Sequence, residues 1–361
     1  DGEEWLRYKS FPVNVALIRA TYCDEDGNAT MDKEAATLDS LAIAQAAKNS
    51  GGIVLLQVEK VVQNGTLDAR KVKIPGIYVD GIVVSRPENH WQTYEAHYNP
   101  ALCGEVKVPV DSIPPMKLNE RKIICRRAAM ELDPQAIINL GIGMPEGIAN
   151  VANEEGLPGL KLTVETGGIG GVPMAGTAFG TCTNPTAILD QPYQFDFYDG
   201  GGLDQAFLGL AECDRFGNIN VSRFGPKIAG CGGFINITQT APVVVYCGTF
   251  TAGGLKVEVK DGKLQILQEG KIKKFIRDVE QVTFGAAYAK ETGQKVLYVT
   301  ERAVFELIDG ELTLTEIAPG VELEKDILAH MEFRPAIAED LKEMDARIFR
   351  DEIMGLLAEK E

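Results

Sequence analysis

The strongest constraint on the fold is an internal repeat. Residues 14–30 align with residues 204–220, and the same offset of 190 residues places 51–62 on 241–252. The second pair of segments is apolar and β-branched, which is typical of buried parallel strands. The first pair carries the turns DEDGN and DRFGN, in which Asp can bond nearby backbone and Gly adopts positive φ freely. A constant offset over this length favours a duplication.

The two copies differ in what precedes them. Residues 115–201 precede the second copy, whereas the first copy enters a strand almost at the start of the chain. Residues 106–122 hold three prolines in a polar context and are typical of a linker. We therefore predict two related open α/β domains with largely parallel sheets, 1–112 and 113–361, the first truncated at its N-terminus.

Composition excludes several functions. The net charge of −16 opposes binding to nucleic acid or anionic membranes. With no apolar run of membrane-spanning length and no secretion signal, we expect a soluble, cytoplasmic protein. Seven scattered cysteines without a CxxC pair and only three histidines predict neither a disulfide framework nor a metal site.

The order of elements after the linker indicates a parallel α/β unit. The patterns predict helix, strand, helix and strand over residues 119–132, 136–143, 145–157 and 160–165. Further on, alternation around an Asp-Gly turn predicts a hairpin over 256–270, and the tail 326–360 reads as amphipathic helix broken by Pro335. Ligands of open parallel sheets bind beyond the carboxyl ends of the strands, where the loops of this unit lie.

Glu165 is the leading catalytic candidate. It ends a predicted strand and is followed by TGGIGGVP, where Gly167 and Gly168 leave room for a bulky substrate. Partial burial would raise the pKa of this carboxyl and strengthen it as a nucleophile toward an activated carbonyl. A helix-capping or salt-bridging glutamate beside a flexible loop stays an open alternative.

Two further glycine loops offer backbone amides to an anion. Gly141 and Gly143 follow a strand and enter a helix, where amides and the positive helix end gather. A dinucleotide-binding fingerprint would need a third glycine at the position of Glu146, but the glycine comes one residue later, as Gly147. This mismatch disfavours a dinucleotide-binding oxidoreductase. A tight turn without a ligand remains the alternative.

The second of these loops is GCGGFINIT. Successive amides near Gly232 and Gly233 could form a nest for an oxyanion. Cys231 lies within the loop, but no histidine is near it in sequence, so we do not favour it as the nucleophile.

The segments NLGIGMPEGIAN, LTVETGGIGGVPMAG, FDFYDGGGLDQAFLGLAECD and GCGGFINITQTA resemble class I coenzyme A transferases, nearest to the single-chain acetate/propionate type. The likeness extends over nearly the whole chain. It implies that Glu165, in the E-x-G-x-x-G motif, is the nucleophile, and that the GIG and GCGG loops hold CoA and the thioester oxyanion. Family members carry a longer N-terminal portion, which agrees with the truncated repeat.

The resemblance implies ping-pong exchange of CoA between short-chain acyl-CoA and carboxylic acids through a glutamyl-CoA thioester. It implies no metal or redox cofactor, and it suggests a homo-oligomer. The N-terminal portion, possibly a separate chain, is an expected partner. Two alternatives remain open: an acyl-CoA thioester hydrolase that uses the same glutamate, and a non-catalytic CoA-binding subunit.

Overall fold

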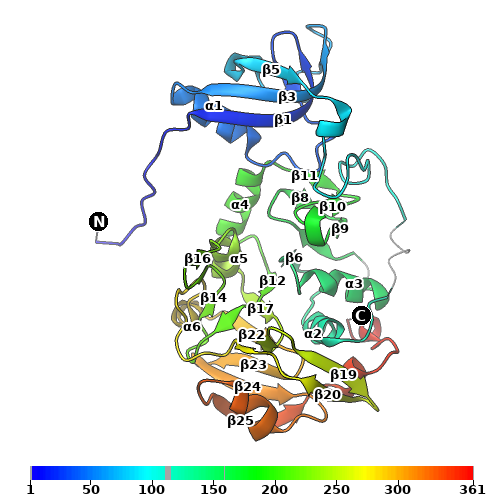
Figure 1. The fold of residues 1–361 in the computed structure, drawn as a ribbon, viewed down its shortest axis with the longest axis vertical. Helices are drawn as coiled ribbons and strands as arrows, with labels where there is room; N and C mark the ends of the chain where they lie inside the picture. Colours follow the sequence, from blue (N-terminus) through cyan, green and yellow to red (C-terminus); the bar gives the residue numbers. More distant parts are fainter. Residues whose placement is uncertain (1, 110–114, 158, 361) are drawn as a thin grey trace.

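The computed structural model describes residues 2–109, 115–157 and 159–360, which build two sheets with separate hydrophobic cores (Figure 1). We call residues 15–109 the first half and residues 115–360 the second half. Strands and helices are mixed in both halves, so the predicted α/β class is confirmed. The predicted domain boundary between residues 112 and 113 lies outside the described residues.

The first half contains a five-stranded sheet in the order β4-β2-β1-β3-β5. β1, β3 and β5 are parallel, while β2 runs antiparallel to both β1 and β4. Helix α1 (Ser40–Asn49) packs Ala44 and Ala47 into the core of this sheet. The strands are β1 (Val15–Asp24), β2 (Ala29–Thr30), β3 (Ile53–Val62), β4 (Val72–Ile74) and β5 (Gly81–Val84).

The second half contains a ten-stranded sheet in the order β11-β8-β7-β6-β12-β17-β22-β23-β24-β25. The central strands β7, β6, β12, β17 and β22 are all parallel, and antiparallel pairs flank them on both sides. The strands are β6 (Ile137–Leu140), β7 (Lys161–Thr163), β8 (Gly168–Ile169), β11 (Ala187–Ile188), β12 (Gln205–Gly209), β17 (Val243–Cys247), β22 (Lys295–Val299), β23 (Ala303–Ile308), β24 (Glu311–Ile317) and β25 (Ala336–Glu343).

Helices cover both sides of these central strands. In Figure 1, α2 and α3 lie on one side, and α4, α5 and α6 lie on the other. Both faces of β12 and β17 are consequently buried, as their near-continuous apolar sequence predicts. The helices are α2 (Glu120–Ala129), α3 (Glu146–Glu154), α4 (Gln191–Asp199), α5 (Phe234–Thr240), α6 (Ala286–Thr292) and α7 (Leu356–Lys360).

Short elements fill the connections. The helical turns are η1 (Gly76–Tyr78), η2 (Pro87–Asn89), η3 (Gly176–Ala178), η4 (Leu323–Ile327), η5 (Leu328–His330) and η6 (Ala346–Phe349). The short strands are β9 (Val172–Pro173), β10 (Cys182–Thr183), β13 (Glu212–Cys213), β14 (Ile219–Asn220), β15 (Arg223–Phe224), β16 (Lys227–Ile228), β18 (Thr251–Ala252) and β21 (Ile272–Lys273). The predicted hairpin is present as β19 (Lys256–Lys260) and β20 (Lys263–Gln268).

Strand pairing supports the duplication. β1 and β3 pair with Val15 opposite Ile53, and β12 and β17 pair with Gln205 opposite Val243. Both pairs are parallel, and the second register is the first register shifted by the 190 residues of the sequence repeat. Each sheet therefore contains an equivalent parallel strand pair, β1–β3 in the first and β12–β17 in the second.

The turns after these strands are also equivalent. Asp24 Oδ1 accepts a hydrogen bond from the backbone N–H of Asn28 at 2.9 Å, and Asp214 Oδ1 accepts one from Asn218 at 3.0 Å. In both turns the Asn side chain donates to the other aspartate oxygen. The predicted Asp-centred turns are thus confirmed in both copies.

The predicted helical tail is wrong. Residues 336–343 form β25, which pairs in parallel with β24 at the edge of the large sheet, and only short helical turns follow. Within β25, Leu341 follows Ala338 by three residues and Ile337 by four, which is the apolar spacing of a helical face, although the segment is an edge strand. The other four predicted elements of the second half are confirmed as α2, β6, α3 and β7.

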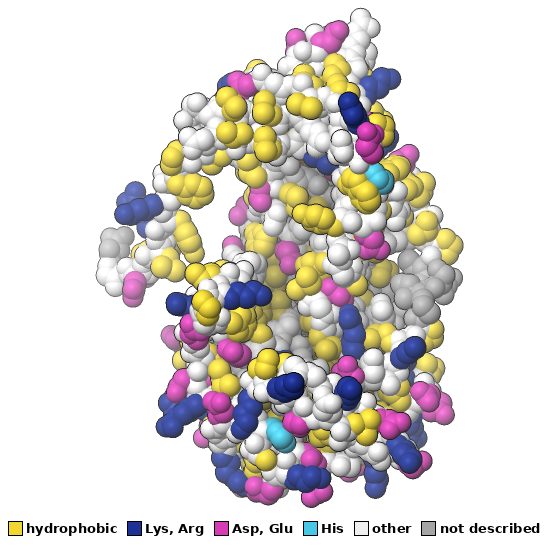
Figure 2. Space-filling model, viewed as in Figure 1, with side chains coloured by type: hydrophobic (Ala, Val, Ile, Leu, Met, Phe, Trp, Pro, Cys, Tyr) yellow, Lys and Arg dark blue, Asp and Glu magenta, His cyan; other side chains and the backbone are white. Residues whose placement is uncertain are grey.

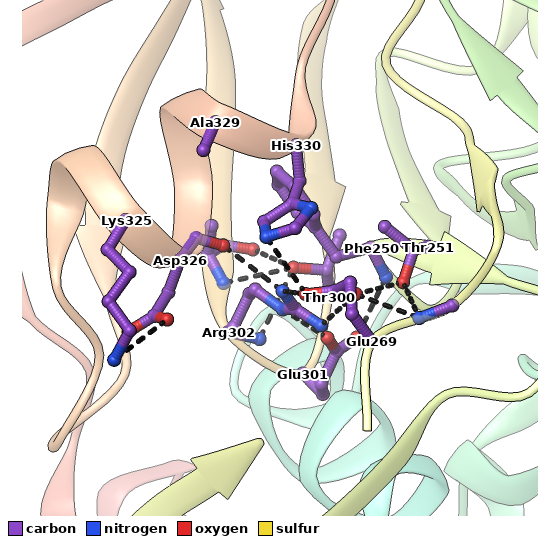
Figure 3. Close-up of polar contacts among 12 residues, drawn as sticks. Phe250, Thr251, Glu269, Thr300, Glu301, Arg302, Lys325, Asp326, Ala329 and His330 are labelled. Carbon is purple, nitrogen blue, oxygen red and sulfur yellow. Dashed lines mark hydrogen bonds and ion pairs between the residues drawn. The ribbon is translucent and has the colours of Figure 1, made fainter. Parts of the chain in front are cut away.

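A buried charge network fastens the far end of the large sheet (Figure 3). Arg302 and Glu301 are both fully buried, and Arg302 Nε donates to Glu301 Oε1 at 2.6 Å. Arg302 Nη1 also donates to Glu269 Oε2 at 2.7 Å and to the Asp326 carbonyl at 3.1 Å. The guanidinium carbon of Arg302 lies over the Phe250 ring, 5.0 Å from its centroid. The network joins three separate segments to the β22–β23 turn.

We expect Arg302→Leu to lower the free energy of unfolding by about 3–5 kcal/mol, because it leaves Glu301 charged, buried and without its partner. Urea unfolding followed by circular dichroism measures the loss. Arg334→Leu is the matched control, since the Arg334–Glu324 pair is mostly exposed and its removal should cost less than about 1 kcal/mol. Equal losses in the two variants would contradict this assignment.

Candidate active site

Glu165 lies on a tight turn directly after β7. The backbone N–H of Gly167 donates to the Val164 carbonyl at 3.0 Å, and the N–H of Val164 donates to the Gly168 carbonyl at 2.9 Å. The strand ends at Thr163, two residues before Glu165, so the carboxylate stands on the turn beyond the strand. It therefore lies beyond the carboxyl ends of the parallel strands, where ligands of such sheets bind.

Asn139 on the neighbouring strand β6 holds the Glu165 carboxylate. Asn139 is fully buried, and its Nδ2 donates to Glu165 Oε2 at 3.4 Å and to the Thr163 carbonyl at 3.3 Å. No Lys, Arg or His in the described parts of the chain forms an ion pair with Glu165. Burial raises the pKa of Glu165, and the bond from Asn139 offsets part of that rise. The alternative of a salt-bridged surface glutamate finds no support in this geometry.

A buried polar chain continues behind Asn139. Tyr198 Oη donates to Thr163 Oγ1 at 2.8 Å and accepts from Gln194 Nε2 at 2.8 Å. Tyr198 and Gln194 are both fully buried on α4. This chain fixes the strand ends that carry Asn139 and the Glu165 turn. Sequence reasoning missed these residues; the one available signal was a polar Asn139 within the apolar strand AIINL, since a buried amide requires partners.

Gly167 is required by its surroundings. Its φ is +113°, and a Cβ at this position would lie 1.9 Å from the Leu189 carbonyl oxygen. A Cβ at the adjacent Gly168 would lie 2.8 Å from Cys182 Sγ. These glycines let the Leu189 segment press against the turn that carries Glu165. Their lack of side chains thus serves packing directly, whether or not a ligand also approaches them.

The other predicted glycines fall into two groups. The N–H of Gly141 already donates to the Phe207 carbonyl at 2.8 Å, and a Cβ at Gly233 would lie 2.8 Å from the Phe195 ring. Gly143 and Gly232 have positive φ and open space around the Cβ position, so a ligand can approach them. Binding of CoA by these four glycines stays a prediction. Cys231, which directly precedes Gly232 in the second loop, is exposed.

A large cavity lies between the two halves next to the Glu165 turn. Its volume is about 940 Å³, and Thr166, the neighbour of Glu165, contributes to its wall. The Thr166 hydroxyl bonds the Gly180 carbonyl and so ties the turn to another wall segment. The space-filling view shows apolar side chains along the lower edge of the upper lobe, above the hollow (Figure 2). The contribution of the first half to this cavity was not predicted.

Comparisons with known proteins show the family of this chain. A family model described as coenzyme A transferase matches residues 1–85. The chain is 50% identical to caffeate CoA-transferase of Acetobacterium woodii over 99% of its length, which covers 69% of that protein. It is 48% identical to acetate CoA-transferase YdiF of Escherichia coli O157:H7, covering 99% of this chain and 67% of that protein.

A comparison with solved structures also finds a CoA-transferase. The crystal structure of the acyl-CoA transferase YdiF from E. coli O157:H7, as a thioester complex with CoA, matches with a TM-score of 0.89 and covers 96% of this chain and 65% of that one. The chain belongs to the coenzyme A transferase family. It spans about two thirds of the length of these relatives. No helix in the described ranges combines the length and apolarity needed to cross a bilayer.

We expect Gly167→Ala to destabilise the chain by clearly more than the ~1–2 kcal/mol of backbone strain alone, because the new methyl group collides with the Leu189 carbonyl. Urea unfolding provides the measurement. Gly262→Ala is the control, since Gly262 has a φ of +72° but open space at its Cβ position. If both variants lose the same stability, the close approach at Gly167 does not constrain the turn.

Proposed function

We propose that the protein transfers CoA between acyl-CoA and carboxylic acids, with Glu165 as the nucleophile. The observation that carries the proposal is a carboxylate on a tight turn beyond the parallel strands, bonded by the Asn139 amide and free of cations among the described residues. Its raised pKa makes the ionised oxygen more nucleophilic than an exposed glutamate. Family membership supports the same reaction.

The cycle has two symmetric halves. A Glu165 oxygen attacks the acyl-CoA carbonyl, which gives a mixed anhydride and the CoA thiolate. The thiolate then attacks the glutamyl carbonyl, forming an enzyme-CoA thioester and releasing the first carboxylate. The acceptor carboxylate repeats these steps in reverse. The cycle uses no metal or redox cofactor, and it requires that water be kept from the anhydride.

The size of the acid is a separate question. The sequence predicts short acids of the acetate or propionate type, while the relatives are named for acetate and for caffeate. One methylene changes binding in an apolar pocket by only about 1–3 kcal/mol, so the reaction class does not fix the acid.

We expect incubation with acetyl-CoA to place CoA on Glu165, which borohydride reduction and peptide mass mapping detect within residues 161–176. The initial labelling rate should rise with pH as Glu165 ionises, with a midpoint above the ordinary glutamate value of 4.5, because burial raises the pKa. Glu165→Gln should abolish labelling. A label on another residue would overturn the proposal, and acyl-CoA loss without an acceptor acid would indicate a thioester hydrolase.

The first half lacks a cover that the second half has. Leu17 is 77% exposed, whereas its repeat counterpart Phe207 is fully buried. Val83 pairs with Gln57 and is 54% exposed, whereas Val299, which pairs with the Gln57 counterpart Cys247, is fully buried. In the second half, α2 packs over this face. We infer that an N-terminal portion, on the same or a separate chain, supplies the matching cover. Apolar side chains in the extended segment 2–12 are exposed and support this inference.

We expect the chain alone to turn over acyl-CoA poorly, and the added N-terminal portion of a longer family member to restore activity. Val83→Asp should weaken this restoration, because a charge on the uncovered face opposes apolar packing. Val282→Asp is the control, since Val282 is equally exposed, at 55%, and lies in the second half. Steady-state assays measure both effects; full activity from the lone chain would refute the inference.

A further inference from the structure

The loop of residues 141–145 is anchored on helix α2 through its carbonyl groups. Arg121 Nη2 donates to the Gly143 carbonyl at 2.7 Å, and Cys125 Sγ donates to the Met144 carbonyl at 3.2 Å. Arg121 and Cys125 are four residues apart on α2, so they lie on the same face of that helix. Two successive carbonyls of the loop therefore point toward α2.

The backbone N–H groups of the same loop are free. Those of Ile142, Gly143 and Met144 donate to no acceptor in the described ranges of the chain. In a trans peptide unit the C=O and the N–H point in opposite directions. Because the Gly143 carbonyl points toward Arg121, the N–H of Met144 points away from α2. Arg121 thus sets the direction of a free backbone donor.

A buried carboxylate keeps Arg121 in this position. Glu146 is 7% exposed, and its Oε2 lies 3.3 Å from Arg121 Nη2. Its other oxygen, Oε1, has no hydrogen-bond partner among the described residues. A buried carboxylate is costly unless a cation pairs with it, so Glu146 holds the guanidinium where it lies. The nitrogen that contacts Glu146 is the one that bonds the loop.

Gly147 allows this arrangement by bringing α3 close to α2. A Cβ at Gly147 would lie 2.6 Å from Cys125 Sγ and 3.2 Å from Arg121 Nε. The glycine that comes one residue too late for a dinucleotide-binding fingerprint therefore serves the packing of two helices. Glu146 occupies the fingerprint position and supplies the carboxylate that pairs with Arg121.

The loop lies at the edge of the sheet that carries the nucleophile. It starts two residues after Asn139, whose side chain bonds Glu165. β6, which leads into the loop, pairs in parallel with β7, which leads into the Glu165 turn. The carboxyl ends of adjacent parallel strands meet at one edge. Backbone donors at such a place stabilise an acyl intermediate when their direction is fixed before the reaction.

We propose that Arg121 is a positioning residue for CoA transfer: it fixes the Gly143–Met144 peptide so that the Met144 N–H faces the thioester oxygen. The inference rests on the proposed function and adds a residue that acts through the loop. A donor with a fixed direction stabilises the oxyanion of the transition state more than the bound thioester. Loss of Arg121 should therefore lower the maximal rate while leaving donor binding nearly unchanged.

The test uses the longest polypeptide that carries this chain and follows Glu165 labelling at increasing acetyl-CoA concentration. Arg121→Met should lower the maximal labelling rate by about tenfold to a hundredfold, the loss that follows removal of a hydrogen bond from a charged donor. The acetyl-CoA concentration at half-maximal rate should change by less than about threefold, as for an interaction made in the transition state. Arg121→Lys retains a cationic donor and should restore most of the rate.

A double variant separates positioning from stability. Arg121→Met alone leaves Glu146 buried without its cation, which can itself destabilise the chain. Arg121→Met combined with Glu146→Met replaces the ion pair by two apolar side chains, so the melting temperature should stay near that of the unmodified protein. The labelling rate of the double variant should remain low, because the Gly143 carbonyl still lacks its donor.

Arg347→Met is the matched control. The Arg347 side chain is 34% exposed, against 38% for Arg121. It likewise pairs with a carboxylate, that of Asp345, and donates to a backbone carbonyl, that of Met354, at 2.9 Å. Because Arg347 does not bond the Gly143 loop, its loss should leave the labelling rate unchanged.

The possible outcomes distinguish this inference from the proposed function. A double variant that labels Glu165 as fast as the unmodified protein would overturn the role of Arg121, since the ion pair would then serve stability alone. A higher half-maximal concentration with an unchanged maximal rate would overturn it as well. If acetyl-CoA does not label Glu165 in the unmodified protein, the proposed function itself fails.

Discussion

The contact between Gly167 and the Leu189 carbonyl constrains the whole site. Because no side chain fits between them, the segment around Leu189 lies directly against the turn that presents Glu165. The same segment bonds Thr37 and Leu38 of the first half. A single close approach therefore sets the position of the Glu165 turn and of the segment that bonds the first half.

Electrostatics at the site follow from that packing. Close contact around the turn removes water from Glu165, which raises the pKa of its carboxyl, while one buried amide from Asn139 keeps the carboxylate oriented. A cation beside Glu165 would lower its pKa and weaken it as a nucleophile. The large sheet does contain fully paired buried charges, in the Arg302 network, but at a different end of the structure where they fasten segments together. The protein thus uses paired charge for cohesion and an unpaired carboxylate for the proposed chemistry.

Sequence patterns predicted the features that depend on local order. The offset of 190 residues between the repeats is also the offset between the pairing registers of β1–β3 and β12–β17. The glycine run after β7 indicated the turn that carries Glu165. The tail was misread because the apolar residues of the half-exposed edge strand β25 are spaced three and four apart, as on one face of a helix. Asn139, Tyr198 and the cavity could not be found in the same way. Their partners lie on other elements, as Tyr198 lies 59 residues from Asn139, and only the packed fold brings them together.

The two copies of the repeat contribute different residues to the surroundings of Glu165. Both copies keep the same central strand pair and the same Asp-centred turn, which are scaffold features. The Glu165 turn follows β7 in the second half, while Arg19, Glu34 and Leu38 of the first half line the neighbouring cavity. The shared strand pair and Asp-centred turns are therefore scaffold, and the residues that surround Glu165 are what distinguishes the second copy from the first.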